Sequence, residues 1–233
     1  MENICKLRSI IEILDSAGIK WWIDHGTLLG IVREARLLPW DDDIDISIFK
    51  SDLEIACKAL EGSRYKLSSH IIKTDRNVKV LSYAKKAKPV DICAYERYDD
   101  YYCKKLIEFP RGRELLAGFL RRAAWRRCRA IERWFRKIDR NLQYKGGFRN
   151  HLRQPLAARY LNRVTRLREK AGIVHSSMVP VGFFIKFDTF TWRGLHLNVP
   201  YNPESYLCFR YGDDWHTPQS KWKWWRDDIS IAR

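Results

Sequence analysis

The sequence predicts an α+β protein: a core of helices and short strands, interrupted by a long basic helical insertion. Three patterns support this class. Residues 4–17 place apolar side chains at helical spacing, residues 43–48 alternate strictly between polar and apolar, and residues 113–139 carry an apolar stripe on an arginine-rich background. Periods of 3.6 and 2 are the signatures of a half-buried helix and a half-buried strand, respectively.

The first forty residues predict a helix, a strand and a second helix. The helix over 4–17 is expected to end at Gly18, and Trp21, Trp22 and Ile23 read as the start of a short buried strand. His25 to Thr27 is expected to form a turn. Leu28 to Glu34 then fits a second helix, followed by a loop over 35–40 that contains Pro39.

The alternation over 43–48 predicts a strand with Ile44, Ile46 and Ile48 facing the core and carboxylates lining the other face. A capped helix is expected from Ser51 to about Leu60. Strands are expected over 78–84 and 89–95; in the latter, one face carries Asp91, Cys93 and Tyr95.

The positive charge is concentrated in the middle of the chain. The net charge is +16, and residues 111–170 hold 19 Lys and Arg against 4 Asp and Glu, a net of +15. Helices are predicted over 113–139 and 156–171, separated by Gly146-Gly147. Such a segment suits an anionic partner: membrane phospholipid, a phosphorylated glycan or nucleic acid. A solvated arginine face is the alternative.

Composition excludes several classes of protein. With 45% hydrophobic residues the chain is not largely disordered, and no stretch approaches 18 consecutive apolar residues. The N-terminus lacks the features of a secretory signal, and the six cysteines form no Cys-x-x-Cys pair, so reduced cysteines are expected. The expected location is the cytoplasm, with peripheral attachment to the inner face of the cytoplasmic membrane as an option.

The residues that carry chemistry lie in one short stretch. Gly26-Thr27-Leu28-Leu29-Gly30 is followed by Asp42 and Asp43-x-Asp45. Two residues apart on a strand, Asp43 and Asp45 point the same way and can share a hard cation such as Mg²⁺ or Mn²⁺. Gly26 and Thr27 let the backbone approach phosphate and offer donors. Asp91, with the same facing pattern, can complete a three-carboxylate site.

An acidic run has a simpler interpretation as a solvated turn with aspartate caps. The Gly-Thr stretch before it, the alternating isoleucines after it and the later Asp91 favour the metal site, because acids this close repel one another unless a cation or several donors compensate them.

Two motifs resemble the LicD family, which includes bacterial phosphocholine transferases and is similar to fukutin-type ribitol-phosphate transferases. The first is Ile23-Asp24-His25-Gly26-Thr27-Leu28-Leu29-Gly30-Ile31-Val32-Arg33 with Leu38-Pro39-Trp40-Asp41-Asp42-Asp43-Ile44-Asp45. The second runs from Tyr206 to Pro218 and resembles a closing Tyr-Gly-x-x-Trp-x-x-Pro pattern. His25 departs from the first motif, where a small or polar residue is expected; it either contacts the donor or packs.

The resemblance implies a nucleotidyltransferase fold, a small mixed sheet flanked by helices, with a core over 1–110, the insertion over 111–172 and a C-terminal part over 173–233. It implies that Asp43 and Asp45 bind the metal and that Asp91 is a ligand or the general base. Donor binding is expected at the following residues: Gly26, Thr27, Gly30, Arg33 and Trp40. Arg33 is expected to neutralise phosphate charge, and Trp40 either stacks on cytosine or packs over the core.

The implied activity is transfer of a phospho-alcohol from a CDP-linked donor, such as CDP-choline or CDP-ribitol, to a hydroxyl of a cell-surface glycan precursor or lipid-linked glycan. A nucleotidyltransferase acting on RNA, protein or a small molecule is the alternative enzyme. A basic nucleic-acid-binding module is the alternative without catalysis, and it leaves the carboxylates unexplained. Tyr211, Trp215 and His216 either line the acceptor side of the site or form a packed lid. Trp222, Trp224 and Trp225 are candidates for contact with sugar or a membrane.

Overall fold

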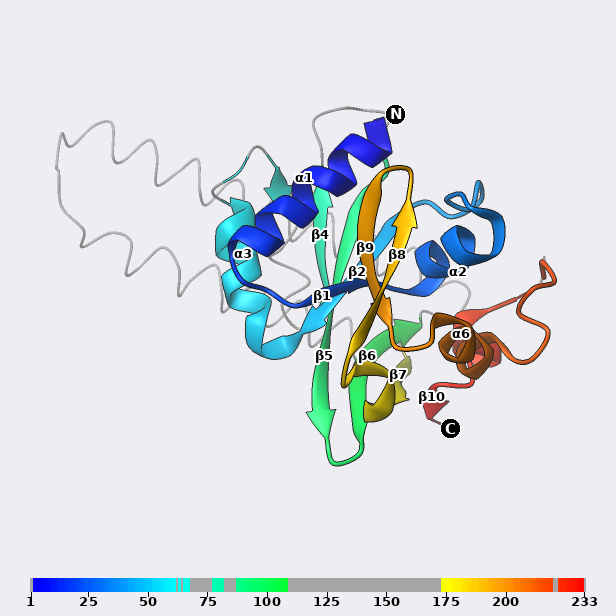
Figure 1. Ribbon diagram of the computed structural model, residues 1–233. Helices are drawn as coiled ribbons and strands as arrows, with labels where there is room; N and C mark the ends of the chain where they lie inside the picture. Colours follow the sequence, from blue (N-terminus) through cyan, green and yellow to red (C-terminus); the bar gives the residue numbers. More distant parts are fainter. Residues whose placement is uncertain are drawn as a thin grey trace, which may run out of the picture. The chain divides into compact units, whose positions relative to one another are not determined.

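The computed structural model describes residues 2–61, 63, 65–67, 77–81, 87–108, 173–219 and 222–232 (Figure 1). The chain divides into two compact units, Met1–Leu106 with His175–Arg233, and Ile107–Val174. The helices predicted over 113–139 and 156–171 lie outside the described residues, and the insertion over 111–172 stays a prediction.

A mixed sheet organises the first unit. Strands in the order β1-β2-β5-β6-β7-β10 form its main path, and β4 pairs with β5 and with β3 to complete an eight-stranded sheet. Neighbouring β2 and β5 are parallel, whereas β1–β2, β4–β5, β5–β6 and β7–β10 are antiparallel. The strands are β1 (Trp21–Ile23), β2 (Ile44–Phe49), β3 (Lys66–Leu67), β4 (Asn77–Leu81), β5 (Val90–Tyr98), β6 (Tyr101–Glu108), β7 (Ile173–Pro180) and β10 (Ile231–Ala232).

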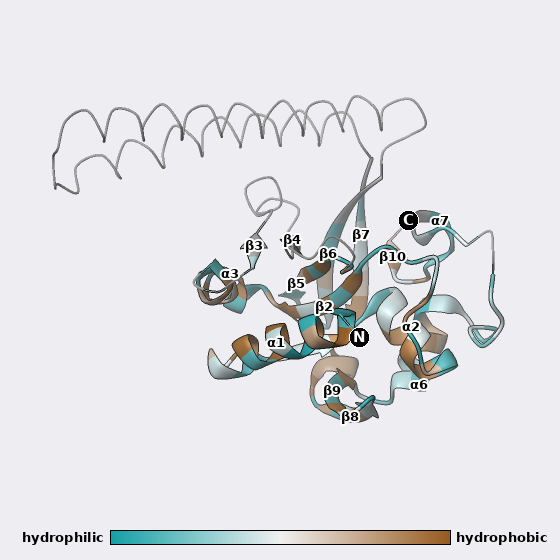
Figure 2. Cartoon of the chain, turned by 90° about the horizontal axis from the view of Figure 1, so that it is seen from above, coloured by the Kyte–Doolittle hydropathy of each residue, from teal (hydrophilic) through white to brown (hydrophobic). Residues whose placement is uncertain are grey.

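This architecture confirms the predicted α+β class with a mixed sheet. Outside the main sheet, β8 (Phe187–Trp192) and β9 (Leu195–Pro200) form an antiparallel hairpin. The remaining elements are α1 (Glu2–Ser16), α2 (His25–Glu34), η1 (Lys50–Asp52), α3 (Leu53–Glu61), η2 (Val181–Phe184), α6 (Pro203–Tyr211) and α7 (Trp224–Asp227). Figure 2 shows α1 and α3 on one side of the sheet and α2 and α6 on the other.

The first helix and the central strand follow the sequence patterns closely. In α1, Leu7, Ile10 and Leu14 are fully buried, and Gly18 follows the helix with a φ of 68°, a left-handed value that favours glycine. In β2, the isoleucines at 44, 46 and 48 are also fully buried. Burial of both stripes supports the predicted helix over 4–17 and the predicted strand over 43–48.

The polar face of β2 is partly buried. Ser47, which shares this face with Asp45, has no exposed surface and donates a hydrogen bond to Asp24 at 2.7 Å. Helix α2 packs on this side of the strand, where Thr27 also bonds to the backbone of Asp45. The polar face is therefore largely an interior one.

The turn predicted at His25–Thr27 is wrong, because these residues form the first turn of α2. Asp24 caps the helix: its side chain accepts a hydrogen bond from the His25 N–H at 2.7 Å. His25 has a φ of 51°, so the chain enters the helix through a left-handed residue. The Gly-Thr stretch is thus the start of a helix placed against β2.

Candidate active site

Three aspartates gather where the chain enters β2. Asp41, Asp43 and Asp45 each offer one carboxylate oxygen, and these oxygens lie within 4.8 Å of one another. Mg²⁺ and Mn²⁺ take oxygen ligands at roughly 2 Å, so oxygens at this mutual separation can share one such ion. The cluster therefore fits a hard divalent cation by both its chemistry and its spacing.

Asp91 lies on the neighbouring strand, directly across from Asp45. The parallel register of β2 and β5 pairs Asp45 with Asp91, so the two side chains project from the same face of the sheet. Asp91 is not part of the three-oxygen group. Its predicted roles, metal ligand or general base, stay predictions, and its position beside Asp45 is compatible with either.

Asp41 was missing from the predicted ligand set. It sits on the loop before β2, where the period of two gives no information about direction. The Lys88 Nζ fixes this loop by donating to the carbonyl oxygens of Leu38, at 3.0 Å, and of Asp41. Gly26 gives room for the carboxylate, because a Cβ on Gly26 would stand 2.3 Å from Asp41 Oδ2.

The cluster carries more negative charge than its surroundings offset. Burial, and then the neighbouring Asp43, raise the pKa of Asp41 to about 6. Burial and Asp43 also raise the pKa of Asp45 well above its ordinary value, although Lys104 opposes the shift. Carboxylates in this state bind either protons or a cation. The electrostatics thus agree with the geometry.

Two of the predicted donor-binding residues hold the framework of the site. The Thr27 hydroxyl accepts a hydrogen bond from the Asp45 N–H at 2.8 Å, and Thr27 is only 1% exposed. Gly30 lets the loop after α2 fold back, because a Cβ there would stand 2.6 Å from the carbonyl oxygen of Arg36. Direct contact of Gly26, Thr27 or Gly30 with donor phosphate stays a prediction.

The other two predicted donor-binding residues differ in their exposure. Arg33 is largely buried; its guanidinium pairs with the Glu34 carboxylate at 2.7 Å and donates to the Trp215 carbonyl oxygen at 3.3 Å. Trp40, in contrast, is 66% exposed and directly precedes Asp41. Trp40 is therefore not a core residue. Of its two predicted roles, packing over the core does not apply.

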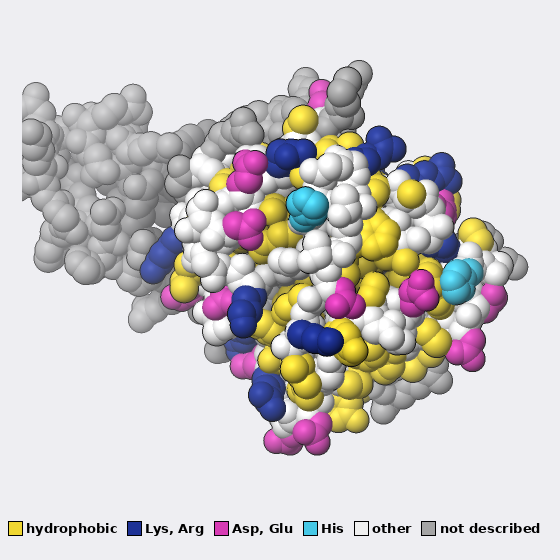
Figure 3. Space-filling model, in the orientation of Figure 1, with side chains coloured by type: hydrophobic (Ala, Val, Ile, Leu, Met, Phe, Trp, Pro, Cys, Tyr) yellow, Lys and Arg dark blue, Asp and Glu magenta, His cyan; other side chains and the backbone are white. Residues whose placement is uncertain are grey.

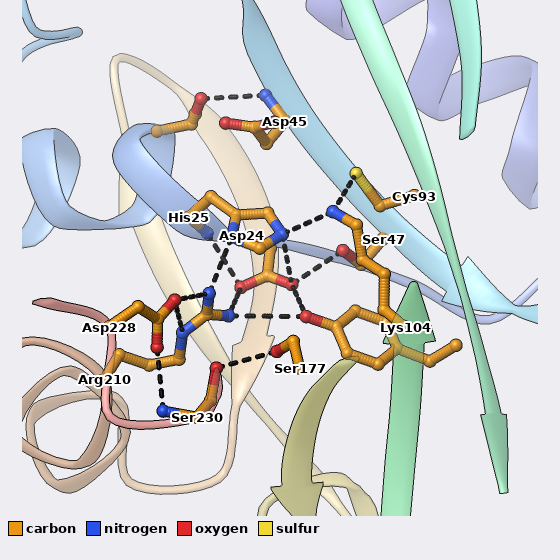
Figure 4. Close-up of polar contacts among 12 residues, drawn as sticks. Asp24, His25, Asp45, Ser47, Cys93, Lys104, Ser177, Arg210, Asp228 and Ser230 are labelled. Carbon is orange, nitrogen blue, oxygen red and sulfur yellow. Dashed lines mark hydrogen bonds and ion pairs between the residues drawn. The ribbon is translucent and has the colours of Figure 1, made fainter. Parts of the chain in front are cut away.

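A buried polar network behind the aspartates was not predicted (Figure 4). Its centre is Asp24, which has no exposed surface and accepts hydrogen bonds from three hydroxyl groups: Ser47 at 2.7 Å, Tyr206 at 2.7 Å and Tyr95 at 3.1 Å. Burial alone would raise the pKa of Asp24, but His25, Arg210 and the hydroxyl donors hold it well below the ordinary value. Asp24 is therefore a buried anion.

Arg210 completes this network from the C-terminal motif. Its guanidinium donates to the Asp228 carboxylate, to Tyr206 Oη at 3.0 Å and to Tyr95 Oη at 3.3 Å. Arg210 is 2% exposed. Asp24 lies in the first sequence motif and Arg210 in the second. The apolar residues around each of them in the sequence do not indicate that the two side chains share one network.

The aromatic residues of the C-terminal motif divide between core and surface. Trp215 is 6% exposed and belongs to the hydrophobic core, whereas His216 is exposed and stacks on it at 3.7 Å between ring centroids. Tyr211 packs on Trp222 at 5.0 Å. These contacts support the packed-lid interpretation for Trp215 and Tyr211.

The fold places a carboxylate cluster at one strand of a mixed sheet. Residues 18–111 match the family model described as LicD/FKTN/FKRP, nucleotidyltransferase domain. This segment of the chain is thus a LicD-family domain, and the resemblance seen in the sequence is confirmed.

Three relatives share short stretches with the chain. Ribitol 5-phosphate transferase FKRP of Mus musculus and that of Homo sapiens are each 36% identical over 56 residues, which is 24% of this chain and 11% of the relative. An uncharacterized protein of Rickettsia prowazekii (strain Madrid E) is 51% identical over 41 residues, 18% of this chain and 15% of that protein. The matched stretches thus span little more than a tenth of these relatives.

Two solved structures are similar at low identity. Lincosamide antibiotic adenylyltransferase LnuA, bound to lincomycin, aligns with a TM-score of 0.41 and 12% identity over 88% of this chain and 84% of that one. ANT(2")-Ia in complex with adenylyl-2"-tobramycin aligns with a TM-score of 0.35 and 15% identity, over 73% and 97%. Among the described residues, no helix has the length and apolar character to cross a membrane.

Proposed function

We propose that this protein transfers a phospho-alcohol from a CDP-activated donor to a hydroxyl group of a cell-surface glycan precursor, in a reaction that depends on Mg²⁺ or Mn²⁺. The observation that carries the proposal is the convergence of Asp41, Asp43 and Asp45 within a LicD-family domain. The name of the FKRP relatives, ribitol 5-phosphate transferase, supports a phospho-alcohol as the transferred group.

The carboxylate cluster suits a donor that contains a diphosphate. Three aspartates leave several positions of an octahedral ion open, and phosphate oxygens are natural occupants of such positions. The bound ion would supply positive charge that offsets the charge of the diphosphate and of the departing CMP. Asp41 joins Asp43 and Asp45 in the proposed ligand set.

In the proposed reaction an acceptor hydroxyl attacks the phosphorus distal to cytidine. An oxygen–phosphorus bond forms to the acceptor, and the bond between this phosphorus and the bridging oxygen breaks, so CMP leaves with that oxygen. Asp91, paired in register with Asp45, is the proposed acceptor of the hydroxyl proton. The exposed Trp40 is proposed to stack on the cytosine ring.

Donor binding is tested first, by thermal unfolding of the full chain with Mg²⁺ and, separately, CDP-choline, CDP-ribitol, ATP or RNA. The proposal expects stabilisation by a CDP-alcohol that requires the metal. Stabilisation by ATP alone would favour nucleotide transfer instead.

The phosphorus that is attacked is identified by the nucleotide product. The full chain is incubated with Mg²⁺, the stabilising donor and a cell-envelope glycan fraction, and the products are separated by chromatography. CMP is the expected product. Release of the free phospho-alcohol, with CMP left on the acceptor, would show attack on the cytidine-bearing phosphorus and overturn the proposal, as would release of pyrophosphate when ATP is the donor.

A further inference from the structure

His25 occupies an unusual backbone conformation next to the carboxylate cluster. Its φ of 51° lies in the left-handed region, which residues other than glycine seldom adopt. It is also the residue that departs from the family motif, where a small or polar side chain is expected. Contacts of the His25 side chain are needed to stabilise this backbone conformation, because a histidine seldom adopts it and the following helix does not require it.

The imidazole ring lies between two buried cationic side chains. Lys104 Nζ lies 2.8 Å from His25 Nε2, and Arg210 Nη2 lies 3.0 Å from His25 Nδ1 (Figure 4). Both cationic residues are 2% exposed, and the His25 side chain is 16% exposed. A neutral imidazole accepts a hydrogen bond at only one nitrogen, so one of these two contacts is a hydrogen bond and the other is close packing. Both ring nitrogens face groups of the protein, which leaves neither directed at a donor molecule.

Each cation is anchored in a different part of the fold. Lys104, on β6, donates to Cys93 Sγ at 2.8 Å, and Cys93 lies two residues beyond Asp91 on the same face of β5. Arg210, on α6, is held by the Asp228 carboxylate. The ring is therefore fixed from the sheet on one side and from the C-terminal segment on the other.

The residue after His25 lies against the carboxylate of Asp41. The next residue, Gly26, lies so close to the Asp41 carboxylate that a Cβ would stand 2.3 Å from Oδ2. A rotation about the His25 backbone would move Gly26 against this carboxylate or away from it. The orientation of Asp41 thus depends on the conformation that Lys104 and Arg210 impose on His25.

We propose that His25 is a positioning residue of the cation site: its ring, clamped between Lys104 and Arg210, fixes the start of α2 and so presents Asp41 to the ion beside Asp43 and Asp45. The inference deepens the proposed function, because it assigns a role to residues outside the carboxylates at the same site. In this role His25 does not contact the donor molecule, which is the alternative that its place in the motif allows.

The test is the affinity of the full chain for Mn²⁺, measured by isothermal titration calorimetry without donor. His25→Phe keeps a ring of similar size but removes both nitrogens, and the expected result is Mn²⁺ affinity at least tenfold weaker than in the wild type. His196→Phe is the matched control, because His196 is exposed on β9, and its affinity should be unchanged. Wild-type affinity in His25→Phe would overturn the proposal.

A second variant covers the case in which His25→Phe does not fold. His25→Asn tolerates the left-handed backbone but cannot reach both cations, so it should also bind Mn²⁺ more weakly. Unchanged Mn²⁺ affinity together with a raised KM for a CDP donor would assign His25 to donor contact and contradict positioning.

The clamp itself is tested by a double-mutant cycle with Arg210→Lys. If Arg210 acts through His25, His25→Phe weakens Mn²⁺ binding much less in the Arg210→Lys background than in the wild type. Equal losses in both backgrounds would contradict the clamp. Failure of the proposed function would be distinguishable from failure of this inference. A wild-type chain that binds Mn²⁺ but releases no CMP from CDP-alcohols would contradict the function, and the Mn²⁺ titrations would still test the role of His25.

Discussion

Trp40 exposes two thirds of its surface immediately before the first aspartate of the cluster, so it contributes little to the core. If the indole stacks on cytosine, Trp40→Ala loses on the order of 1–3 kcal/mol of donor binding, which is roughly a five- to 150-fold rise in KM for the CDP donor. Trp40→Phe should retain part of the affinity. The melting temperature of both variants should match the wild type; an unchanged KM in Trp40→Ala would remove the residue from the donor site.

The raised pKa of Asp41 leads us to expect that the metal-free protein loses stability as pH rises. Its pKa in the folded protein is about 6 against an ordinary 3.8, so the folded state binds a proton more tightly than the unfolded state does. The stability that this proton contributes is complete below about pH 4 and is lost as pH rises through about 6. The raised pKa of Asp45 acts in the same direction.

The measurement compares melting temperatures of metal-free wild type and Asp41→Asn between pH 4 and 7. Asp41→Asn should gain stability over the wild type as pH rises, because its amide does not ionise. Saturating Mg²⁺ should narrow the difference at pH 7, since the ion stabilises the ionised cluster of the wild type. A difference that is constant with pH would show that Asp41 is not repelled by its neighbours.

Strand alternation predicted that Asp45 and Asp91 project from one face of the sheet, and the register of β2 and β5 pairs these two residues. Alternation could not predict Asp41, whose direction comes from Lys88 and from the space over Gly26. These contacts join residues far apart in the chain. A loop has no period from which they could be read.

Among the helices, α2 contains two glycines, and each leaves space for a different neighbour. A Cβ at Gly26 would meet the movable carboxylate of Asp41, whereas a Cβ at Gly30 would stand 2.6 Å from the backbone oxygen of Arg36. Gly26→Ala should therefore weaken Mn²⁺ binding with little change in stability. Gly30→Ala should lower the free energy of unfolding by about 1–3 kcal/mol, because the loop must shift.

Chemical denaturation and Mn²⁺ titration of the two variants separate these effects, each variant serving as the other's control. A large loss of stability in Gly26→Ala with normal metal affinity would mean that Asp41 is not placed by this contact.

The elements themselves were largely predictable. Period 3.6 gave α1 and period 2 gave β2, since each buries one stripe of apolar residues. The first turn of α2 was missed because Asp24 directly follows the buried strand β1. With no loop between strand and helix, the sequence does not mark Asp24 as a helix cap. Alternation reports polarity and not what packs above the strand, so the buried hydrogen bond from Ser47 to Asp24 could not be predicted.

At the scale of the whole molecule, charge is distributed unevenly. The face in Figure 3 mixes acidic and basic side chains, in keeping with a first unit whose charges nearly cancel. Nearly all of the net +16 comes from residues 111–170, which lie outside the described residues. We propose that this segment brings the protein to an anionic membrane surface that carries the glycan acceptor.

Co-sedimentation with vesicles tests this proposal. Binding to phosphatidylserine-containing vesicles is expected at low salt and should weaken several-fold as ionic strength rises, because surface charges are screened. Vesicles of phosphatidylcholine alone are the control and should bind little. Absence of binding to anionic vesicles at low salt would favour a solvated basic face.

The connection between the two ends of the chain could not be predicted. Tyr206 and Asp24 are 182 residues apart and meet in a hydrogen bond of 2.7 Å. Both motifs were visible in the sequence, but single-chain patterns carry no information about which distant segments share an interior. The buried Lys104 had no sequence signal at all, since its β6 position resembles an exposed one.

The most direct test of the account is CMP release from a CDP-alcohol by the wild type, Asp43→Asn and Asp45→Asn, measured with and without Mg²⁺. We expect that the wild type requires the metal and that each variant loses at least about 10²-fold in turnover while its circular dichroism spectrum is unchanged. Folded variants that retain wild-type turnover would contradict the claim that these carboxylates carry the reaction.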